Sequence, residues 1–574
     1  MTKMISGFLD TQDYIHFRIV DTHGETLHTF VGAASAIPCL PGDTCQWTEE
    51  HCVLISRKKH TNLVGNLHLQ SKYRYGMTSR GVPIYLFTPQ NRGYPPLIVG
   101  CSRKETDKNI LALVDFEDWG NLKGHPRGNL REVLGECGDY DAEKKALLYV
   151  ASPYKIPKDW MDDERCISEV NLSDRIELPE NTFHIDPVGC KDIDDVISIE
   201  YVDSETYIWI TISDVSEIIK EGSKEDILAS QICQTTYSLQ GEALKPMLPP
   251  HYSENICSLL PGKIRLGISL RCQVQADGNL YVENVYKTLV RVTKSYSYES
   301  VYDDPSFPKQ LFVKITHTIL GSSANHRDSH TWIEALMIFY NRYVGSLLKE
   351  LGKGVLRSHA GSDPSREALL RTLSDETLLA YANYAATYVD AGTSADTTHK
   401  ALGIETYCHA TSPIRRYADL VNQRVLKAWL SGQTVNVGYN IYQLQTREKE
   451  NKQYSHHCQF LELLQESQNS QINVQVLALE DFEEGRIRIT AWVPVWKRIF
   501  SFHMNGGMIG EGVASVEDVI QHTKNTIHIQ DILTMNYKTF PQQARWMDRI
   551  LFQIVYIDVN SHVVIDGDKA SPAE

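Results

Sequence analysis

The sequence has no apolar run long enough to cross a membrane, and its 12 cysteines include no Cys-x-x-Cys pair. A spanning helix needs about 18 or more consecutive apolar residues. Scattered cysteines exclude a zinc ribbon and a disulfide framework, and they indicate free thiols in a reducing compartment. The first residues also lack the apolar core of a signal peptide, so we expect a cytoplasmic protein with no membrane partner.

The chain also lacks an excess of positive charge. Its 57 Lys and Arg residues face 72 Asp and Glu residues, which gives a formal net charge of −15. Taken alone, this charge argues against a nucleic-acid partner, although a catalytic site rich in carboxylates would itself lower the total. Internal repeats and low-complexity tracts are missing as well. A chain of 574 residues is expected to form three or four domains.

Short alternating segments separated by turn-forming sequences dominate the first part of the chain. They predict two small β-barrels, at residues 1–58 and 59–155, and a single β-sandwich fits the same pattern equally well. From residue 471 to 574, alternating segments that include 562–566 predict a separate C-terminal β domain.

Residues 156–470 mix strand and helix patterns. Two alternating segments around the turn Asp203–Thr206 predict a β-hairpin over 196–215. A long amphipathic helix is predicted from Trp332 to Leu351, because its apolar residues recur at helical spacing and glycines follow it. The expected fold class is multidomain α+β, with a mixed α/β domain at its centre.

Four aspartates crowd the start of this hairpin: Asp186, Asp192, Asp194 and Asp195. Like charges repel, and burying even one unpaired charge is costly. A divalent cation would remove the conflict, and oxygen ligands favour magnesium, with manganese as the alternative. On an extended strand, Asp192 and Asp194 would share a face, and Asp195 would point elsewhere unless the strand begins there. Magnesium sites borrow ligands from substrate phosphates, so the pattern indicates phosphoryl chemistry.

Two simpler explanations of the aspartates are a calcium-binding loop and a solvated acidic turn. A calcium loop needs a glycine at its sixth position and a glutamate at its twelfth. The sixth residue from Asp192 and the twelfth from Asp186 are both Ile197, so neither start fits. A solvated acidic turn rarely precedes an apolar strand. A metal site explains the pattern better than either.

A second helix is expected to begin in the sequence SPIRRYADL, with Ser412 as its N-cap and Pro413 at its first position. Arg415 and Arg416 then fall in the first turn, where the helix dipole disfavours cations. A phosphate bound at this end would explain them, and an Arg415–Asp419 pair within the helix is the simpler alternative. Beside carboxylates and a metal, such arginines complete a site for hydrolysis of a phosphodiester.

These two motifs resemble the signatures of a known family. HIDPVGCKDIDDV, residues 184–196, is similar to the first signature of the ribonuclease II (RNB) family of exoribonucleases, and YCHATSPIRRYADLVNQRVL, residues 407–426, is similar to its second. Further segments agree in order between about residues 160 and 430. The resemblance implies two OB-type β-barrels before an RNB catalytic domain at 156–470, and one OB-type RNA-binding barrel after it.

The family degrades single-stranded RNA processively from the 3′ end and releases nucleoside 5′-monophosphates by magnesium-dependent hydrolysis. By motif position, the resemblance implies that Asp186 and Asp195 hold the metal. Asp192 and Asp194 would complete the site as catalytic residues and metal ligands, one of them binding a second ion or the 3′-terminal hydroxyl.

The resemblance also implies residues that bind RNA. Arg415 would contact the scissile phosphate, and Arg416 would bind RNA beside it. Tyr237 would stack on or clamp the terminal nucleotide, and Tyr298 would pack against a base further up the channel. Ordinary core packing is the alternative for each tyrosine.

Three features depart from the family pattern. SQICQTTY lacks the usual arginine before Thr-x-Tyr, Glu217 stands where His usually follows Asp-Val-Ser, and Gln423 stands where His often precedes Arg424. None of them touches the aspartates or Arg415, so we expect an active exoribonuclease, a monomer that acts on single-stranded RNA and not on DNA. A catalytically inactive RNA-binding regulator on the same scaffold is the alternative. A magnesium-dependent phosphatase would not need three flanking barrels.

Overall fold

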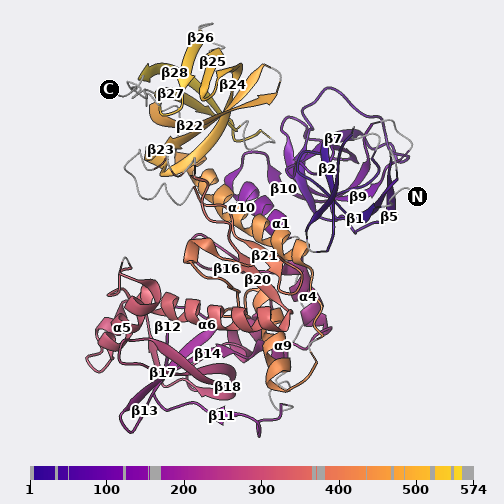
Figure 1. Ribbon diagram of the computed structural model, residues 1–574. Coiled ribbons are helices and arrows are strands. Elements are labelled where there is room, and N and C mark those ends of the chain that lie inside the picture. The colour runs from indigo at the N-terminus through magenta and orange to yellow at the C-terminus, as the bar shows by residue number, and fades with distance from the viewer. Residues whose placement is uncertain are drawn as a thin grey trace, which may run out of the picture.

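The structure is a computed structural model of the 574-residue chain (Figure 1). It describes residues 5–22, 24–32, 37–48, 51–120, 124–152, 154, 170–322, 324–364, 367, 370, 382–434, 436–466, 471–483, 485–517, 524–543 and 549–558. The predicted boundary at 155–156, residue 470 at the next boundary, and the predicted strand at 562–566 lie outside these residues.

The N-terminal part forms two separate sheets, each with its own core. Strands β1–β5 make an antiparallel sheet in the order β3-β2-β1-β4-β5, around a core that includes Leu9 and Phe17. Strands β6–β10 close into a barrel in the order β10-β8-β7-β6-β9, with Leu67 and Phe87 inside. Two sheets with separate cores exclude a single sandwich. The strands are β1 (Ile5–Thr11), β2 (His16–Val20), β3 (Thr26–Val31), β4 (Thr44–Thr48), β5 (His51–Ser56), β6 (Leu63–Leu67), β7 (Ile84–Pro89), β8 (Leu97–Gly100), β9 (Ile110–Asp118) and β10 (Arg127–Glu136).

A seven-stranded antiparallel sheet, in the order β26-β25-β24-β23-β22-β27-β28, forms the C-terminal part. Helix α1 (Tyr140–Ala151), which follows the barrel, and the long helix α10 (Ile441–Glu466) pack against it. Leu147 of α1, Leu461 of α10 and Val474 of β22 share one core. The elements are β22 (Gln471–Glu483), β23 (Arg486–Val493), η5 (Pro494–Trp496), β24 (Arg498–Gly510), β25 (Val513–Glu517), β26 (Lys524–His528), β27 (Ile532–Thr539) and β28 (Ile550–Asp558).

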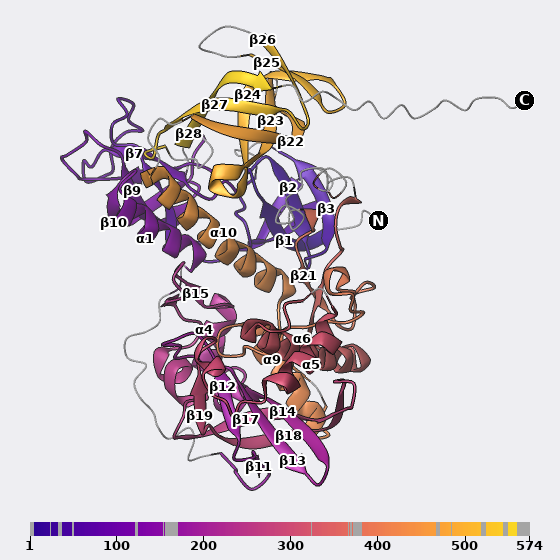
Figure 2. The same cartoon turned by 90° about the vertical axis from the view of Figure 1, so that its left-hand side faces the viewer.

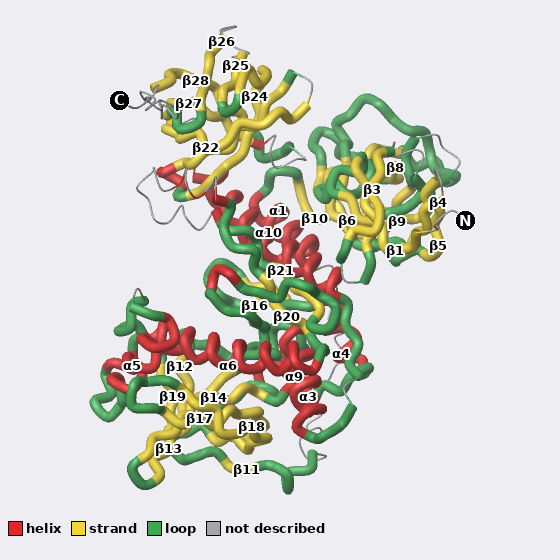
Figure 3. The backbone as a smooth tube through the Cα atoms, viewed as in Figure 1, coloured by secondary structure: helices red, strands yellow, loops and turns green. Residues whose placement is uncertain are grey.

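The central part is built on a mixed seven-stranded sheet with helices on one face (Figure 3). Its order is β11-β18-β17-β14-β13-β12-β19, and the predicted hairpin is β13–β14, which turns between Val202 and Glu205. Isoleucines at alternate positions of these strands are buried against α6. The predicted long helix is confirmed as α6, and Gly352 is its left-handed C-cap. The elements are β11 (Ile176–Glu177), β12 (Thr182–Ile185), β13 (Asp195–Val202), β14 (Glu205–Ser213), β17 (Ile264–Val274), β18 (Leu280–Arg291), β19 (Lys294–Tyr296), α5 (Lys309–Leu320) and α6 (Ser329–Leu351).

Shorter elements surround one end of this sheet. They are α3 (Val215–Ile218), α4 (Lys224–Ile232), β15 (Thr236–Tyr237), β16 (Ala243–Lys245), η1 (Tyr252–Ile256), η2 (Ser300–Tyr302), β20 (Val355–Ser358), β21 (Thr387–Asp390), η4 (Lys400–Leu402) and α9 (Tyr417–Leu430). Seen from the side, all three flanking sheets lie beyond the same end of the central part, and α10 runs between them and it (Figure 2). The predicted multidomain α+β fold class is confirmed. No helix in the described part of the chain has the length and apolarity needed to cross a bilayer.

A buried ion pair joins the barrel's helix to the C-terminal sheet. Glu143 of α1 accepts a hydrogen bond from Nη2 of Arg549, just before β28, at 3.0 Å, and both side chains are buried. Burial raises the pKa of Glu143, whereas Arg549 lowers it, so the carboxylate depends on its partner for charge.

Replacing Arg549 by Met should therefore strand a buried carboxylate and cost about 3–5 kcal/mol of stability. Guanidinium unfolding followed by circular dichroism would measure the loss. The double variant Glu143→Gln/Arg549→Met should recover part of it, because no charge is left behind. Equal midpoints for Arg549→Met and wild type would contradict this account.

Candidate active site

The acidic segment is the connection between two neighbouring strands. Strands β12 and β13 pair antiparallel, with Phe183 opposite Ile197, so the loop between them brings all four aspartates to one end of the sheet. Strand β13 begins at Asp195, so the expectation that Asp192 and Asp194 share the face of an extended strand is wrong. The alternative, that the strand begins at Asp195, is confirmed.

Asp192 and Asp194 lie in a loop and not on a strand, because the residue between them, Ile193, is held by hydrogen bonds to both its N–H and its carbonyl. Its N–H donates to Ser258 Oγ at 3.0 Å, its carbonyl accepts from the Leu259 N–H at 3.0 Å, and its side chain is buried. This anchoring between Asp192 and Asp194 fixes where their carboxylates point.

Asp194 meets the second motif directly. Its Oδ1 accepts from the Ile414 N–H at 2.9 Å, and its Oδ2 accepts from Nε of Arg415 at 3.2 Å. The carboxylate is 4% exposed, and burial raises the pKa of Asp194 to about 7, although Arg415 opposes the rise. The two predicted constellations therefore form one site.

The other three carboxylates lie in different surroundings. His184 Nδ1 is 2.9 Å from Oδ2 of Asp186, and the Tyr237 hydroxyl donates to Oδ2 of Asp192. No donor among the described residues contacts the Asp195 side chain. Burial, together with the charges of Asp186 and Asp194, raises the pKa of Asp195 well above its usual range. Asp195 therefore needs a proton or a cation to be stable.

The segment carrying the arginines differs from its prediction. Helix α9 begins at Tyr417, so Ser412 is not its N-cap, Pro413 lies in a preceding turn, and Arg415 and Arg416 lie just before the helix. A tertiary contact explains the difference, since the Ser412 N–H donates to Oδ1 of a residue within the helix, Asp419, at 2.8 Å.

The alternative pairing expected for Arg415 is also wrong. Asp419 pairs with Arg416, whose Nη2 lies 2.8 Å from Oδ1, and Arg415 is left to contact Asp194. Nη2 of Arg415 also donates to Ser412 Oγ at 3.0 Å. With 44% of its side chain exposed, Arg415 remains accessible to a ligand.

A single cavity of about 1200 Å³ collects all eight residues predicted for the site. These are Asp186, Asp192, Asp194, Asp195, Tyr237, Tyr298, Arg415 and Arg416. Tyr298 stacks against His330 with ring centroids 3.7 Å apart, so one face of its ring is already covered. Burial beside Asp186 raises the pKa of Tyr298 to about 12.

Sequence reasoning missed a group of histidines on the cavity wall: His359, His399 and His409. Burial and neighbouring cationic groups lower the pKa of His399 to about 4 and that of His409 well below its usual range, which keeps both neutral at pH 7. The sequence pointed to these histidines only in that they lie in segments that resemble the family. Histidines this far apart in the chain do not by themselves predict a cluster.

The donor set suits a hard cation, although the present arrangement does not form a cage for one. In the described ranges, no three His, Cys, Asp or Glu side chains converge closely enough to hold a metal ion. Arg415 and Tyr237 donate hydrogen bonds to oxygens of Asp194 and Asp192, while the half-buried Asp195 carboxylate has no donor among the described residues. Carboxylate oxygens are the ligands that magnesium prefers, so the residues fit such an ion chemically.

The fold is a central domain of mixed sheet and helices that carries an acidic cavity and is flanked by small β-sheet modules. The model of the RNB domain matches residues 175–304 and 309–432, and the model of the Dis3-like cold-shock domain 2 matches residues 84–151. The central part of the chain is therefore an RNB domain, and its flanking modules are of the OB type.

Curated relatives and solved structures agree with this assignment. Ribonuclease R of Thermotoga maritima is 25% identical over 411 residues, which is 57% of each chain. The chain spans about half the length of the curated relatives it matches. Mycoplasma genitalium RNase R, solved in complex with ribose-methylated single-stranded RNA, has a TM-score of 0.71 at 16% identity, covering 96% of this chain and 100% of that one. Yeast Ssd1, a pseudonuclease, has a TM-score of 0.63 at 14% identity, covering 90% and 81%.

The raised pKa of Asp194 predicts a pH-dependent cost of folding. Folded Asp194 releases its proton near pH 7 and an unfolded aspartate near 3.8, so the folded chain binds more protons in between and loses stability as pH rises through this window. Asp194→Asn should remove this loss and gain about 1–4 kcal/mol relative to wild type between pH 4 and 8.

Urea unfolding in a chelating buffer across this range would measure the difference. Asp174→Asn, at an acid whose side chain is 48% exposed, is the control and should show no such trend. A pH-independent difference between Asp194→Asn and wild type would rule out a raised pKa.

Proposed function

We propose that this protein is a 3′-to-5′ exoribonuclease that hydrolyses single-stranded RNA processively to nucleoside 5′-monophosphates. The observation that carries the proposal is the contact of Arg415 with Asp194, which brings a phosphate-binding cation to the acidic loop inside one large cavity. We further propose that it acts as a cytoplasmic monomer and does not degrade DNA.

Asp186, Asp192, Asp194 and Asp195 would hold magnesium, or manganese in its place. A bound ion of this kind supplies a water of lowered pKa and neutralises charge on the phosphate. His184 supports this assignment, because its contact with Oδ2 of Asp186 orients that carboxylate. Asp192 is oriented in the same way by the hydroxyl of Tyr237.

The remaining residues bind and orient RNA. Arg415 would donate to the scissile phosphate and stabilise the charge that builds up during hydrolysis. Tyr237, whose hydroxyl contacts Asp192, would stack on or clamp the last nucleotide. Tyr298 would offer its uncovered face to a base, and Arg416 would bind the backbone while still paired with Asp419. The flanking OB-type modules would guide a single strand towards the cavity.

An inactive RNA-binding regulator is the second candidate, and the similarity of the fold to a pseudonuclease favours it. The two candidates differ in the need for buried carboxylates. RNA binding alone would leave Asp195 as an uncompensated, half-buried acid, which costs stability. In the catalytic proposal, Asp195 is a ligand of the metal ion, which compensates its charge.

Incubation of the protein with a 5′-labelled single-stranded RNA in magnesium should shorten the label stepwise from the 3′ end. Asp194→Asn should slow cleavage by more than about 100-fold, because the charge facing Arg415 is lost. RNA binding, followed by fluorescence anisotropy, should stay close to wild type. Nucleoside 5′-monophosphates are the expected product.

Asp174→Asn serves as the control for that assay, since the residue pairs with Lys287 and does not line the cavity. Intact label after long incubation with wild type would favour the inactive regulator. Internal cuts would contradict an exonuclease.

The cation assignment predicts that the protein binds Mn²⁺, which can be followed by the loss of the free-ion EPR signal. Asp195→Asn should weaken binding by roughly tenfold or more, since it removes a ligand charge. Asp174→Asn should bind as wild type does. Failure of the wild-type protein to bind Mn²⁺ at millimolar concentration would reject the cation, whatever the activity.

A further inference from the structure

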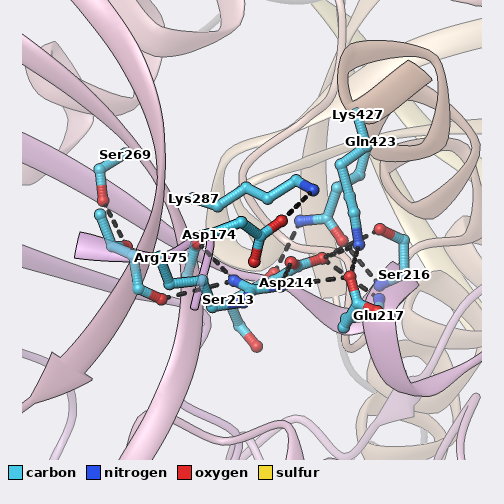
Figure 4. A network of polar contacts seen from close by, with 12 residues as sticks. Asp174, Arg175, Ser213, Asp214, Ser216, Glu217, Ser269, Lys287, Gln423 and Lys427 are labelled. Atoms are coloured by element: carbon cyan, nitrogen blue, oxygen red, sulfur yellow. Dashed lines mark hydrogen bonds and ion pairs between the residues drawn. The ribbon is translucent and has the colours of Figure 1, made fainter. Parts of the chain in front are cut away.

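One buried amide fastens helix α9 to the strand beside the acidic loop. Gln423, in the second turn of α9, is 3% exposed. The Ser216 N–H donates to its Oε1 at 2.9 Å, and its Nε2 donates to the Ser213 carbonyl at 2.7 Å. Figure 4 shows the amide between these two residues. It therefore satisfies one acceptor and one donor on the same short stretch of backbone.

Ser213 leads directly to Asp194. The Ser213 N–H donates to the Asp194 carbonyl at 2.8 Å, while the Asp194 side chain accepts from Ile414 and Arg415. The segment before α9 thus contacts the side chain of Asp194. Gln423, in the second turn of α9, contacts Ser213, which binds the backbone of the same aspartate. These contacts form a closed ring through Asp194, Arg415, Gln423 and Ser213.

Ion pairs surround this amide without taking part in the ring (Figure 4). Arg175 Nη2 lies 2.6 Å from Asp214 Oδ2, and Lys427 Nζ lies 3.0 Å from Asp214 Oδ1. Partial burial raises the pKa of Glu217, but Lys427 and Lys220 outweigh it and lower the pKa to about 2. Glu217 and Gln423, two positions that depart from the family pattern, therefore meet in one network.

A neighbouring residue shows why Gln423 matters for register. Asn422 makes a similar double contact with Val355 of β20, through its Oδ1 and Nδ2, both at 2.8 Å. Helix α9 is therefore fixed on two sides by amides that read backbone groups. Of these two amides, Gln423 is the one that leads to Asp194, because it bonds to Ser213.

We infer that Gln423 is a positioning residue that holds Arg415 at its distance from Asp194, so that both act on one phosphate. The inference rests on the proposed exoribonuclease function. Gln423 does not line the cavity, contacts none of the four aspartate side chains, and works through the position of α9. A displacement of about 1 Å at a reacting group can lower a rate by roughly 100-fold.

Gln423→Met tests the inference, because methionine keeps the length of the side chain and removes both hydrogen bonds. Single-turnover cleavage of a 5′-labelled RNA with excess enzyme separates the rate constant from the active fraction. We expect the rate constant to fall by about 10- to 100-fold. The amplitude and the RNA affinity measured in a chelating buffer should stay near wild type, whereas simple loss of folded protein would lower the amplitude instead.

Two further variants complete the test. Gln423→His can still donate to the Ser213 carbonyl and should recover most of the rate. Lys427→Met removes two ion pairs, with Asp214 and Glu217, from the same network and helix without touching Ser213 or Ser216. It should therefore lower stability and leave the rate constant close to wild type. A Gln423→Met rate equal to that of Lys427→Met would overturn the inference.

A readout that needs no activity separates this inference from the proposed function. If Gln423 and Asp194 belong to one ring, the effects of Gln423→Met and Asp194→Asn on unfolding should not add in the double variant. Additive effects would overturn the ring even if RNA is degraded. Non-additive effects with no cleavage by wild type would reject the exoribonuclease and keep the coupling.

Discussion

The contact between the Arg415 guanidinium and the Asp194 carboxylate joins residues 221 positions apart and organises the cavity around it. One arginine cannot neutralise four neighbouring aspartates. Tyr237 gives a hydrogen bond to Asp192, and His184 contacts Asp186, but these groups bring no fixed positive charge. Asp195, half-buried and without a donor in the described ranges, carries the remaining deficit. The site is thus short of positive charge, and substrate binding without a cation would make the shortage worse.

Helix α9 transmits this constraint to the rest of the domain. Its buried face carries polar side chains, each with a backbone or charged partner: Asp419 with Ser412, Asn422 with Val355, Gln423 with Ser213 and Ser216, and Arg424 with Asp226. Apolar residues at such positions would pack in several registers at similar energy. Directional hydrogen bonds favour one register, because any slip leaves buried polar groups unsatisfied.

Local patterns in the sequence were sufficient to predict the hairpin and the long helix α6. They also singled out the four aspartates, Arg415 and Arg416, whereas Tyr237 and Tyr298 came only from the resemblance to a family. The hairpin and the helix follow from alternation and helical spacing, which need no long-range information. The start of α9 could not be predicted in this way. Ser412 is a good N-cap by type, yet Asp419 and Asp194 capture the backbone N–H groups of Ser412 and Ile414, so the turn before the helix is set by tertiary contacts.

The histidines that line the cavity and the ring of contacts through Gln423 could not be predicted from the sequence, for the same reason. His359, His399 and His409 come from separate segments, and nothing in their spacing predicts that they line one cavity. Gln423 looked like a simple departure from a family pattern. Its meaning depends on Ser213, about two hundred positions earlier, which only the packed structure brings next to α9.

The same charge deficit helps to choose between an active nuclease and a scaffold that only binds RNA. The fold is compatible with both, so the choice has to rest on side chains. RNA is a polyanion, and a surface that only binds it gains nothing from buried carboxylates, which repel phosphate and cost stability when unpaired. Here Asp194 is 4% exposed, and Asp195 lies next to it with a strongly raised pKa. Neutral amides of the same shape would remove that cost without disturbing the sheet. Carboxylates in this position make physical sense when a cation binds between them and the phosphate, which is the arrangement that hydrolysis requires.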